Sequence, residues 1–146
     1  MKLCKTCIPK KNVTTITTTK TKKLWKKGFG THSEFPNDKK PKLKSIKKRH
    51  PRKATIDVEL DLGEKFKNRM IYYYASKRGT QCAEMLDWDK AYGKFQNSGI
   101  SKLDNKGKAI LKVMRPQAYV EDGDTYFPHV HFLLTNSNNT QWINKL

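Results

Sequence analysis

Two histidines and a tyrosine in the last third of the chain are the residues best suited to chemistry. His129 and His131 are two positions apart beside the apolar run 130–134, and Tyr119 precedes them. If that run is a β-strand, both imidazoles point to the same side of it. Imidazoles placed in this way can share a metal ion, and a phenolate oxygen suits a hard ion such as ferric iron. The pattern predicts a metal site, although an H-x-H pair can also line the polar face of a half-buried strand.

The positive charge of the chain is concentrated in its first third. The 146 residues carry a net charge of +18. Residues 1–53 contribute +16, from eighteen Lys and Arg and two acids, whereas residues 54–146 contribute +2, from thirteen Lys and Arg and eleven acids. This division predicts a basic N-terminal arm, residues 1–53, with no core of its own, and a nearly neutral folded domain, residues 54–146.

The arm has too few apolar residues to form a core. Free in solution, we expect it to be extended and disordered, because it cannot bury enough surface to offset the loss of conformational entropy. Its charges repel one another, so we expect it to run over neighbouring subunits rather than pack on its own domain. Scattered apolar side chains among lysine pairs resemble anchors for a partner. The predicted partner-binding residues are Leu24, Trp25, Phe29, Phe35, Lys22, Lys23, Lys26 and Lys27.

The sequence indicates neither a secreted nor a membrane-inserted protein. Residues 1–11 lack the apolar segment of a signal peptide, and no run approaches the ~20 apolar residues of a membrane helix. Three cysteines do not make a disulfide framework, so a reducing intracellular compartment is expected. Cys4 and Cys7 form a single C-x-x-C, which leaves open whether they bind zinc.

From residue 54 onwards the pattern is that of β-strands. Ile56, Val58, Leu60 and Leu62 alternate with polar residues, as in a half-buried strand. Turns are predicted at 104–107 and 121–124. Short strands between turns, with no convincing amphipathic helix, predict an all-β fold, a small β-sandwich. Strands are predicted at 56–62, 70–75, 84–88, 100–103, 109–113 and 130–134, with a last edge segment at 142–143.

Four segments of the domain resemble, in the same order, motifs of the intradiol ring-cleavage dioxygenases. These are a tryptophan segment, an Asp-x-x-Gly hairpin, a Pro-x-x-Tyr and a His-x-His-Phe. The resemblance implies a prealbumin-like sandwich and a ferric ion held by two tyrosines and two histidines. Tyr119, His129 and His131 match three of these ligands. The four segments are Trp88–Phe95, Asp104–Ala109, Arg115–Tyr119 and His129–Phe132.

Two positions depart from the family pattern. Phe95 stands where the first tyrosine ligand is expected and has no oxygen to donate, which leaves Tyr92 or one of residues 72–74 to replace it. Tyr126 stands where the family has an arginine that stabilises the anionic substrate. A catalytic iron needs its complete set of ligands and an open position for substrate. The resemblance therefore implies a sandwich whose catalytic chemistry is at least partly lost.

Three classes of function remain, and the first is favoured. It is a structural or interaction protein of a large assembly, such as a minor capsid protein or another virion component of a large DNA virus, with no cofactor and no enzymatic activity. The second is a non-haem Fe(III) intradiol-type dioxygenase. The third is a nucleic-acid-binding protein of the cytoplasm or nucleus, which would bind phosphates through the basic arm with a steep salt dependence. No RRM, KH, OB or zinc-finger signature supports the third class.

Overall fold

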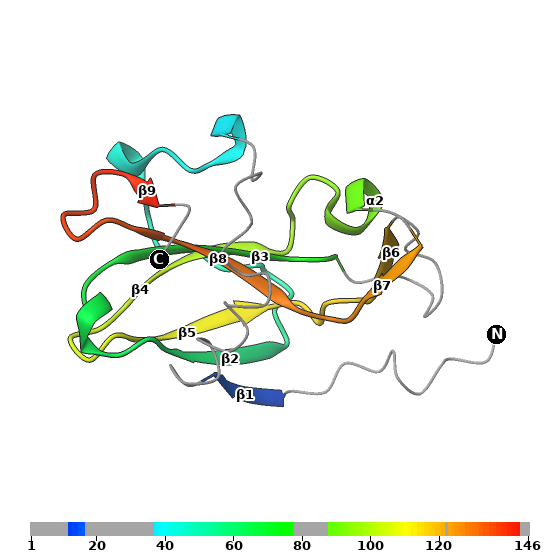
Figure 1. Cartoon of the computed structure of the whole chain (residues 1–146), viewed down its shortest axis with the longest axis horizontal. Coiled ribbons are helices and arrows are strands. Elements are labelled where there is room, and N and C mark those ends of the chain that lie inside the picture. Colours follow the sequence, from blue (N-terminus) through cyan, green and yellow to red (C-terminus); the bar gives the residue numbers. More distant parts are fainter. Residues whose placement is uncertain (1–11, 17–36, 78–87, 122, 144–146) are drawn as a thin grey trace.

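The strands of the protein are seen in a computed structural model that describes residues 12–16, 37–77, 88–121 and 123–143 (Figure 1). Helical structure in these residues is limited to α2 (Trp88–Tyr92) and to 3₁₀ turns at Asn37–Lys39, Leu43–Ser45 and Glu64–Phe66. None of the described helices has the length and hydrophobicity needed to span a membrane. The strands are β1 (Asn12–Ile16), β2 (Ile56–Asp61), β3 (Met70–Ala75), β4 (Ser98–Lys102), β5 (Lys108–Val113), β6 (Tyr119–Glu121), β7 (Asp124–Tyr126), β8 (Val130–Thr135) and β9 (Trp142–Ile143).

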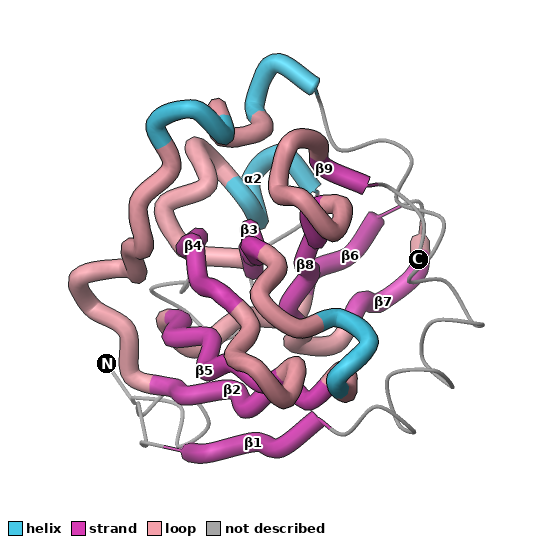
Figure 2. The backbone as a smooth tube through the Cα atoms, turned by 90° about the vertical axis from the view of Figure 1, so that its left-hand side faces the viewer, coloured by secondary structure: helices cyan, strands magenta, loops and turns pink. Residues whose placement is uncertain are grey.

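Two sheets form a small β-sandwich, so the predicted fold class is confirmed (Figures 1 and 2). Sheet A has the strand order β1-β2-β5, and sheet B has the order β4-β3-β8-β9. Apart from the parallel pair β1 and β2, every strand pair in these sheets is antiparallel. β6 and β7 form a separate hairpin beside them. β9 lies at an edge of sheet B, as the sequence predicts for residues 142–143.

The core between the sheets is built from side chains that alternate along the strands. In β2, Val58 and Leu60 are buried while Glu59 between them is exposed. Full burial of each such aliphatic side chain stabilises the fold by about 1.5–3 kcal/mol. The buried residues of this core are Val58, Leu60, Leu62, Ile71, Tyr73, Leu103, Leu111, Val113 and Leu134.

Sheet B carries a second apolar layer on its outer face. Tyr72 and Tyr74 of β3 point away from sheet A, opposite to Ile71 and Tyr73. β3 is therefore buried on both faces, which explains its continuous run of aromatic residues. α2 and the start of β6 cover this outer face. Its buried residues are Tyr72, Tyr74, Ala91, Tyr92, Ile100, Tyr119 and Leu133.

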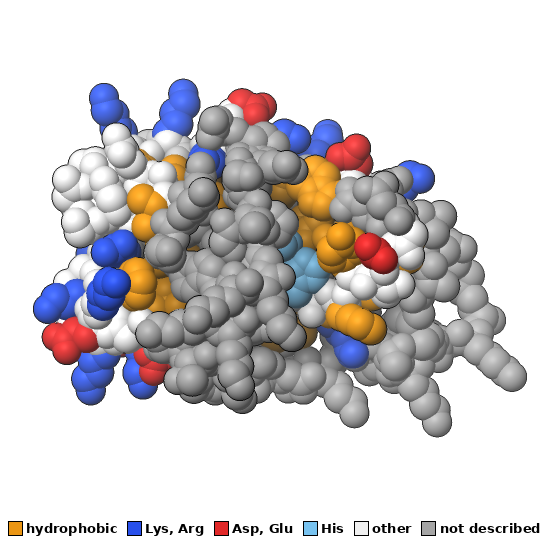
Figure 3. Space-filling view, viewed as in Figure 1, with side chains coloured by type: hydrophobic (Ala, Val, Ile, Leu, Met, Phe, Trp, Pro, Cys, Tyr) orange, Lys and Arg blue, Asp and Glu red, His pale blue; other side chains and the backbone are white. Residues whose placement is uncertain are grey.

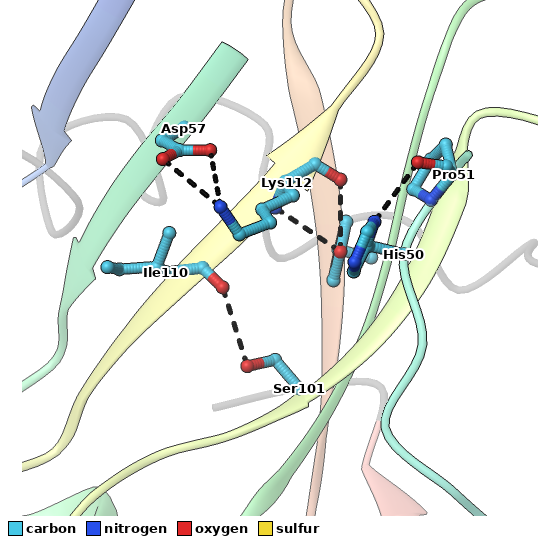
Figure 4. Close-up of polar contacts among 7 residues, drawn as sticks. His50, Pro51, Asp57, Ser101, Ile110 and Lys112 are labelled. Atoms are coloured by element: carbon cyan, nitrogen blue, oxygen red, sulfur yellow. Dashed lines mark hydrogen bonds and ion pairs between the residues drawn. The ribbon is translucent and has the colours of Figure 1, made fainter. Parts of the chain in front are cut away.

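The Tyr73 hydroxyl joins the two sheets in the core. The Tyr73 Oη donates to the backbone oxygen of Lys112 at 3.0 Å and accepts from its backbone N–H at 3.3 Å. Gly99 leaves room for this hydroxyl, because an added Cβ would lie 2.2 Å from it. The Lys112 side chain, on the solvent side of β5, forms an exposed ion pair with Asp57 at 3.2 Å (Figure 4). Exposed pairs of this kind contribute little to stability.

The described part of the arm packs on its own sandwich, which corrects the expectation that it would run only over neighbours. Arg49 exchanges two backbone hydrogen bonds with Ile100, at 2.8 and 3.0 Å. The Trp142 indole N–H donates to the backbone oxygen of Pro41 at 2.9 Å, and Ile46 packs on the outer layer. These contacts satisfy backbone groups at the edges of the sheet, whereas repulsion between exposed lysines is screened by salt.

Several sequence predictions concern residues outside the described ranges. The partner-binding residues Leu24, Trp25, Phe29 and Phe35 with their neighbouring lysines, and the Cys4–Cys7 pair, all lie there. The division at residue 53 stays a prediction. Of the strand predicted at 84–88, only Trp88 is described, and it begins α2 rather than ending a strand.

The predicted turn at 104–107 is confirmed, but it joins β4 of sheet B to β5 of sheet A, so the hairpin expected between these two strands is wrong. Asp104 Oδ1 accepts the backbone N–H groups of Lys106 and Lys108 at 2.8 and 2.9 Å, which lowers the pKa of its carboxyl. Gly107 completes the turn with a φ of 78°, and a Cβ at this position would lie 1.9 Å from the Gly63 oxygen. The close approach of two backbones therefore requires glycine here.

We predict that Gly107→Ala lowers the free energy of unfolding by about 3 kcal/mol or more, because the added methyl group meets backbone that cannot yield. Gly123→Ala is the matched control, since Gly123 has a φ of 85° with no atom near the added Cβ. It should cost only about 1–2 kcal/mol, the penalty of a left-handed conformation. Equal losses for the two variants in urea titrations would contradict the steric account.

We also predict that a chain starting at residue 37 unfolds cooperatively and is more stable than one starting at residue 54. The difference should be about 2–4 kcal/mol, from two lost backbone hydrogen bonds and the lost burial of Ile46. Thermal and urea unfolding of the two chains measure it. Equal stability would restore the boundary predicted at residue 53.

Candidate metal centre

Four residues from three neighbouring elements meet on the outer face of sheet B. Tyr92 is the last residue of α2, and Tyr119 is the first residue of β6. His129 directly precedes β8, and His131 is its second residue. In β8 the side chains alternate, so His131 and Leu133 lie on the outer face while Leu134 enters the core between the sheets.

The polar atoms of the other three side chains lie around the Tyr92 hydroxyl. Tyr92 Oη lies 3.0 Å from His131 Nε2, 3.2 Å from His129 Nε2 and 3.4 Å from Tyr119 Oη. The two imidazole Nε2 atoms are 2.9 Å apart. Two phenol oxygens and two imidazole nitrogens thus form one compact group, named the donor cluster below.

The structure brings three of the sequence-predicted site residues together and adds a fourth. Tyr119, His129 and His131 gather on one side of the sandwich, as the sequence predicts. Tyr92, one of the residues considered in place of Phe95, supplies the phenol at the centre of the group. The Phe95 ring instead packs against Tyr92, Tyr74 and Trp88, with their ring centroids 5.6–6.0 Å away.

The choice of Tyr92 follows from the local backbone. A strand would place residues 92 and 95 on opposite faces, whereas a helical turn places residues three apart on the same side. α2 ends at Tyr92, and Gly93 and Phe95 then adopt positive φ values of 51° and 55°. A helix signal in Trp88–Tyr92 would have identified Tyr92, but five residues are too few to show helical periodicity.

The orientation of His129 leaves a lone pair facing the cluster. Its Nδ1 is bonded to the backbone oxygen of Phe127, and a carbonyl can only accept, so Nδ1 carries the proton. Burial lowers the pKa of His129, which favours the neutral ring. Its Nε2 therefore presents a lone pair to the other three donors. Metal-binding histidines are commonly held by a backbone carbonyl in this way.

Aromatic side chains pack around the donor cluster, which is partly open to solvent on one side. Tyr92, Tyr119 and His131 are 1%, 4% and 7% exposed, whereas His129 is only half-buried. The Tyr74 ring stacks on His131 with centroids 4.9 Å apart. In the space-filling view, histidine surface is visible beside a group of hydrophobic side chains (Figure 3). Solvent or a small molecule thus approaches from the side of His129.

The spacing of the donors fits a single metal ion. An ion with bonds of about 2.0–2.1 Å keeps neighbouring ligand atoms about 2.9 Å apart at right angles and about 3.4 Å apart at tetrahedral angles. Tyr92 Oη, His129 Nε2 and His131 Nε2 lie 2.9–3.2 Å from one another, and Tyr119 Oη lies 3.4 Å from Tyr92 Oη. In the metal-free protein the same atoms hydrogen-bond to one another, so the site is preformed.

Among the described residues, no group of three or more His, Cys, Asp or Glu could hold a metal ion, and the donor cluster itself contains only two residues of these types. A groove of about 540 Å³ lies over β2 and β5, but the donor cluster takes no part in it. Its carboxylates are engaged already, since Asp61 pairs with Lys108 at 3.3 Å and Asp104 binds backbone amides. The lining residues are Glu59, Leu60, Asp61, Ser101, Asp104, Lys108, Ala109 and Ile110.

The chain matches no protein-family model, no curated protein and no solved structure in comparisons with each. The resemblance to intradiol dioxygenases therefore stays a hypothesis that rests on four short sequence segments. The geometry of the donor cluster is an independent basis for a functional proposal.

We predict that Tyr92→Phe lowers the free energy of unfolding of the metal-free protein by about 1–3 kcal/mol, because three buried polar groups lose their common partner. Tyr126→Phe is the matched control, since its ring is 41% exposed and its loss should change stability by less than about 0.5 kcal/mol. Urea unfolding in the presence of a chelator measures both. A loss no larger than that of the control would mean that the Tyr92 hydroxyl does not hold the cluster together.

Proposed function

We propose that this protein binds a ferric ion through Tyr92, Tyr119, His129 and His131 and is a non-haem iron protein of the intradiol type. One observation carries the proposal: Tyr92 Oη and the two imidazole Nε2 atoms lie at the mutual separations that ligands of one ion adopt, and Tyr119 Oη lies 3.4 Å from Tyr92 Oη. This is also the ligand set that the sequence resemblance implies, with Tyr92 in place of the missing tyrosine.

The chemistry of the donors favours ferric iron over other ions. Phenolate is a hard anionic ligand, and two phenolates balance two of the three charges of the ion in a site with little access to water. Structural zinc sites are built mainly from cysteine and histidine, and this cluster offers no thiolate. Both phenols must lose a proton on binding, so metal affinity should rise with pH.

The surroundings of the cluster limit what reaction it could support. A ferric ion held there would supply a Lewis acid able to bind a catechol through both oxygens and promote ring opening by dioxygen. His129 lies on the more accessible side and would face an incoming molecule. Tyr126, which stacks on Tyr119 with centroids 5.2 Å apart, brings no positive charge to an anionic substrate. Any ring cleavage should therefore be slow.

A second candidate is a structural or interaction protein of a large assembly, such as a minor capsid protein of a virion. The burial of three of the four donors favours it, because structural metal sites are closed whereas catalytic sites keep an open position. The ion would then join α2, β6 and β8 without taking part in turnover. Both candidates share the same metal site and differ in whether substrate reaches it.

We predict that the purified protein takes up one ferric ion per chain and becomes coloured, because tyrosinate bound to ferric iron absorbs visible light. Tyr92→Phe and Tyr119→Phe should each weaken iron binding by at least about 10–100-fold, the range seen even for groups behind the direct ligands. Tyr126→Phe should leave binding unchanged. Elemental analysis and visible titration with a ferric chelate measure the effect.

A protein that stays colourless and iron-free after loading would overturn the metal proposal. Equal loss of binding in Tyr126→Phe would place the ion elsewhere. With iron bound, oxygen uptake in the presence of a catechol separates the two candidates: uptake that is lost in Tyr119→Phe supports the dioxygenase, and its absence in the loaded protein supports the structural role.

A further inference from the structure

A continuous row of oxidisable rings runs through the outer layer and passes directly through the donor cluster. Neighbouring ring centroids along the row are 6.3, 5.8, 5.7, 5.6 and 5.2 Å apart. Each ring is thus in contact with the next. In order, the rings are those of Trp142, Tyr72, Tyr74, Tyr92, Tyr119 and Tyr126.

Both ends of the row reach the surface while its middle is buried. Tyr126 is 41% exposed and Trp142 is half-buried, whereas Tyr72 and Tyr74 are each 2% exposed. The row therefore connects a protected interior to solvent at two separate places. Tyr126 lies at the β7 end of the β6–β7 hairpin, and Trp142 lies in the edge strand β9.

Polar atoms of these rings take part in hydrogen bonds: the Trp142 indole N–H donates to Pro41, and the Tyr92 and Tyr119 hydroxyls lie in the donor cluster. Phenylalanine would fill the same space without such bonds. Tyrosine and tryptophan differ from phenylalanine in another respect: each gives up one electron at a potential that biological oxidants reach.

We propose that this row is a relay that carries oxidising equivalents between the donor cluster and the protein surface at Tyr126 and Trp142. Electron transfer falls off steeply with distance, and a sequence of contacts replaces one long step by several short ones. The row of rings exists without a metal, so the relay goes beyond the proposed function; only its physiological oxidant rests on that function.

The electrons balance if a hydroperoxide is reduced at the cluster and thiols supply the electrons at the surface. The hydroperoxide O–O bond breaks with two electrons and two protons, giving an alcohol and water. Two thiols each give up one electron and one proton and join as a disulfide. Each ring on the way loses one electron and regains one, so the protein returns to its starting state.

The relay is tested by injecting an oxidising equivalent at one end and detecting it at the other. Gln141, exposed and next to Trp142, is replaced by cysteine and labelled with a ruthenium photosensitiser, in a chain whose Cys4, Cys7 and Cys82 are serine. Illumination with an electron acceptor in the metal-free protein then creates the oxidant beside Trp142. Peptide mass spectrometry with a radical trap should find the modification on Tyr126.

Tyr74→Phe should abolish this modification of Tyr126, because phenylalanine is too hard to oxidise and interrupts the row. Tyr72→Phe should do the same, which guards against an effect of one variant on folding. Tyr73→Phe is the matched control: it lies between them in β3 but points into the core between the sheets, and it should leave the modification intact.

Unchanged modification of Tyr126 in both Tyr74→Phe and Tyr72→Phe would overturn the relay, as would oxidation of Trp142 that never reaches Tyr126. Because the test needs no iron, it is separate from the loading experiment. A protein that fails to bind iron but passes the photochemical test keeps the relay and loses the metal proposal. A protein that binds iron but shows no modification of Tyr126 in the photochemical test keeps the metal proposal and loses the relay.

Discussion

The burial of β3 on both faces is the constraint on which the rest of the structure depends. Strand geometry sends Tyr73 into the core between the sheets and Tyr72 and Tyr74 to the other side. A half-buried sheet would leave those two rings in water, so α2, β6 and part of the arm must cover them. The donor cluster lies within this cover. The donor cluster thus arises where a sheet that is apolar on both faces is covered by a third layer.

The chemistry of the donor cluster depends on the same layering. Sheet B holds His131 rigidly, while α2 and β6 bring Tyr92 and Tyr119 to it from shorter, less regular elements. The low exposure of the group strengthens interactions among its polar atoms and would strengthen those with a bound cation. Two properties that favour metal binding, a complete donor set and few competing waters, therefore come from the packing of aromatic side chains.

The sequence was most informative where one face of a strand is apolar. The alternation of Ile56 to Leu62 predicted β2, the turn at Asp104 predicted the connection from β4 to β5, and the fold class followed. It was least informative where short segments make tertiary contacts. Tyr92 could not be selected before α2 was seen, because five residues show no period. The docking of Pro41 and Arg49 was missed because it uses backbone atoms, which side-chain composition does not reveal.

The hydrogen bond between Trp142 and Pro41 has a consequence for the order in which the protein folds during synthesis. The two residues are 101 positions apart, and β8, which pairs with the centre of sheet B, is made only shortly before Trp142. Until the ribosome has released that segment, the edge of β3 and the rings of its outer face stay uncovered. Nascent chains would therefore expose an aromatic surface between the synthesis of β3 and that of β8, and it is at this stage that a chaperone would be needed.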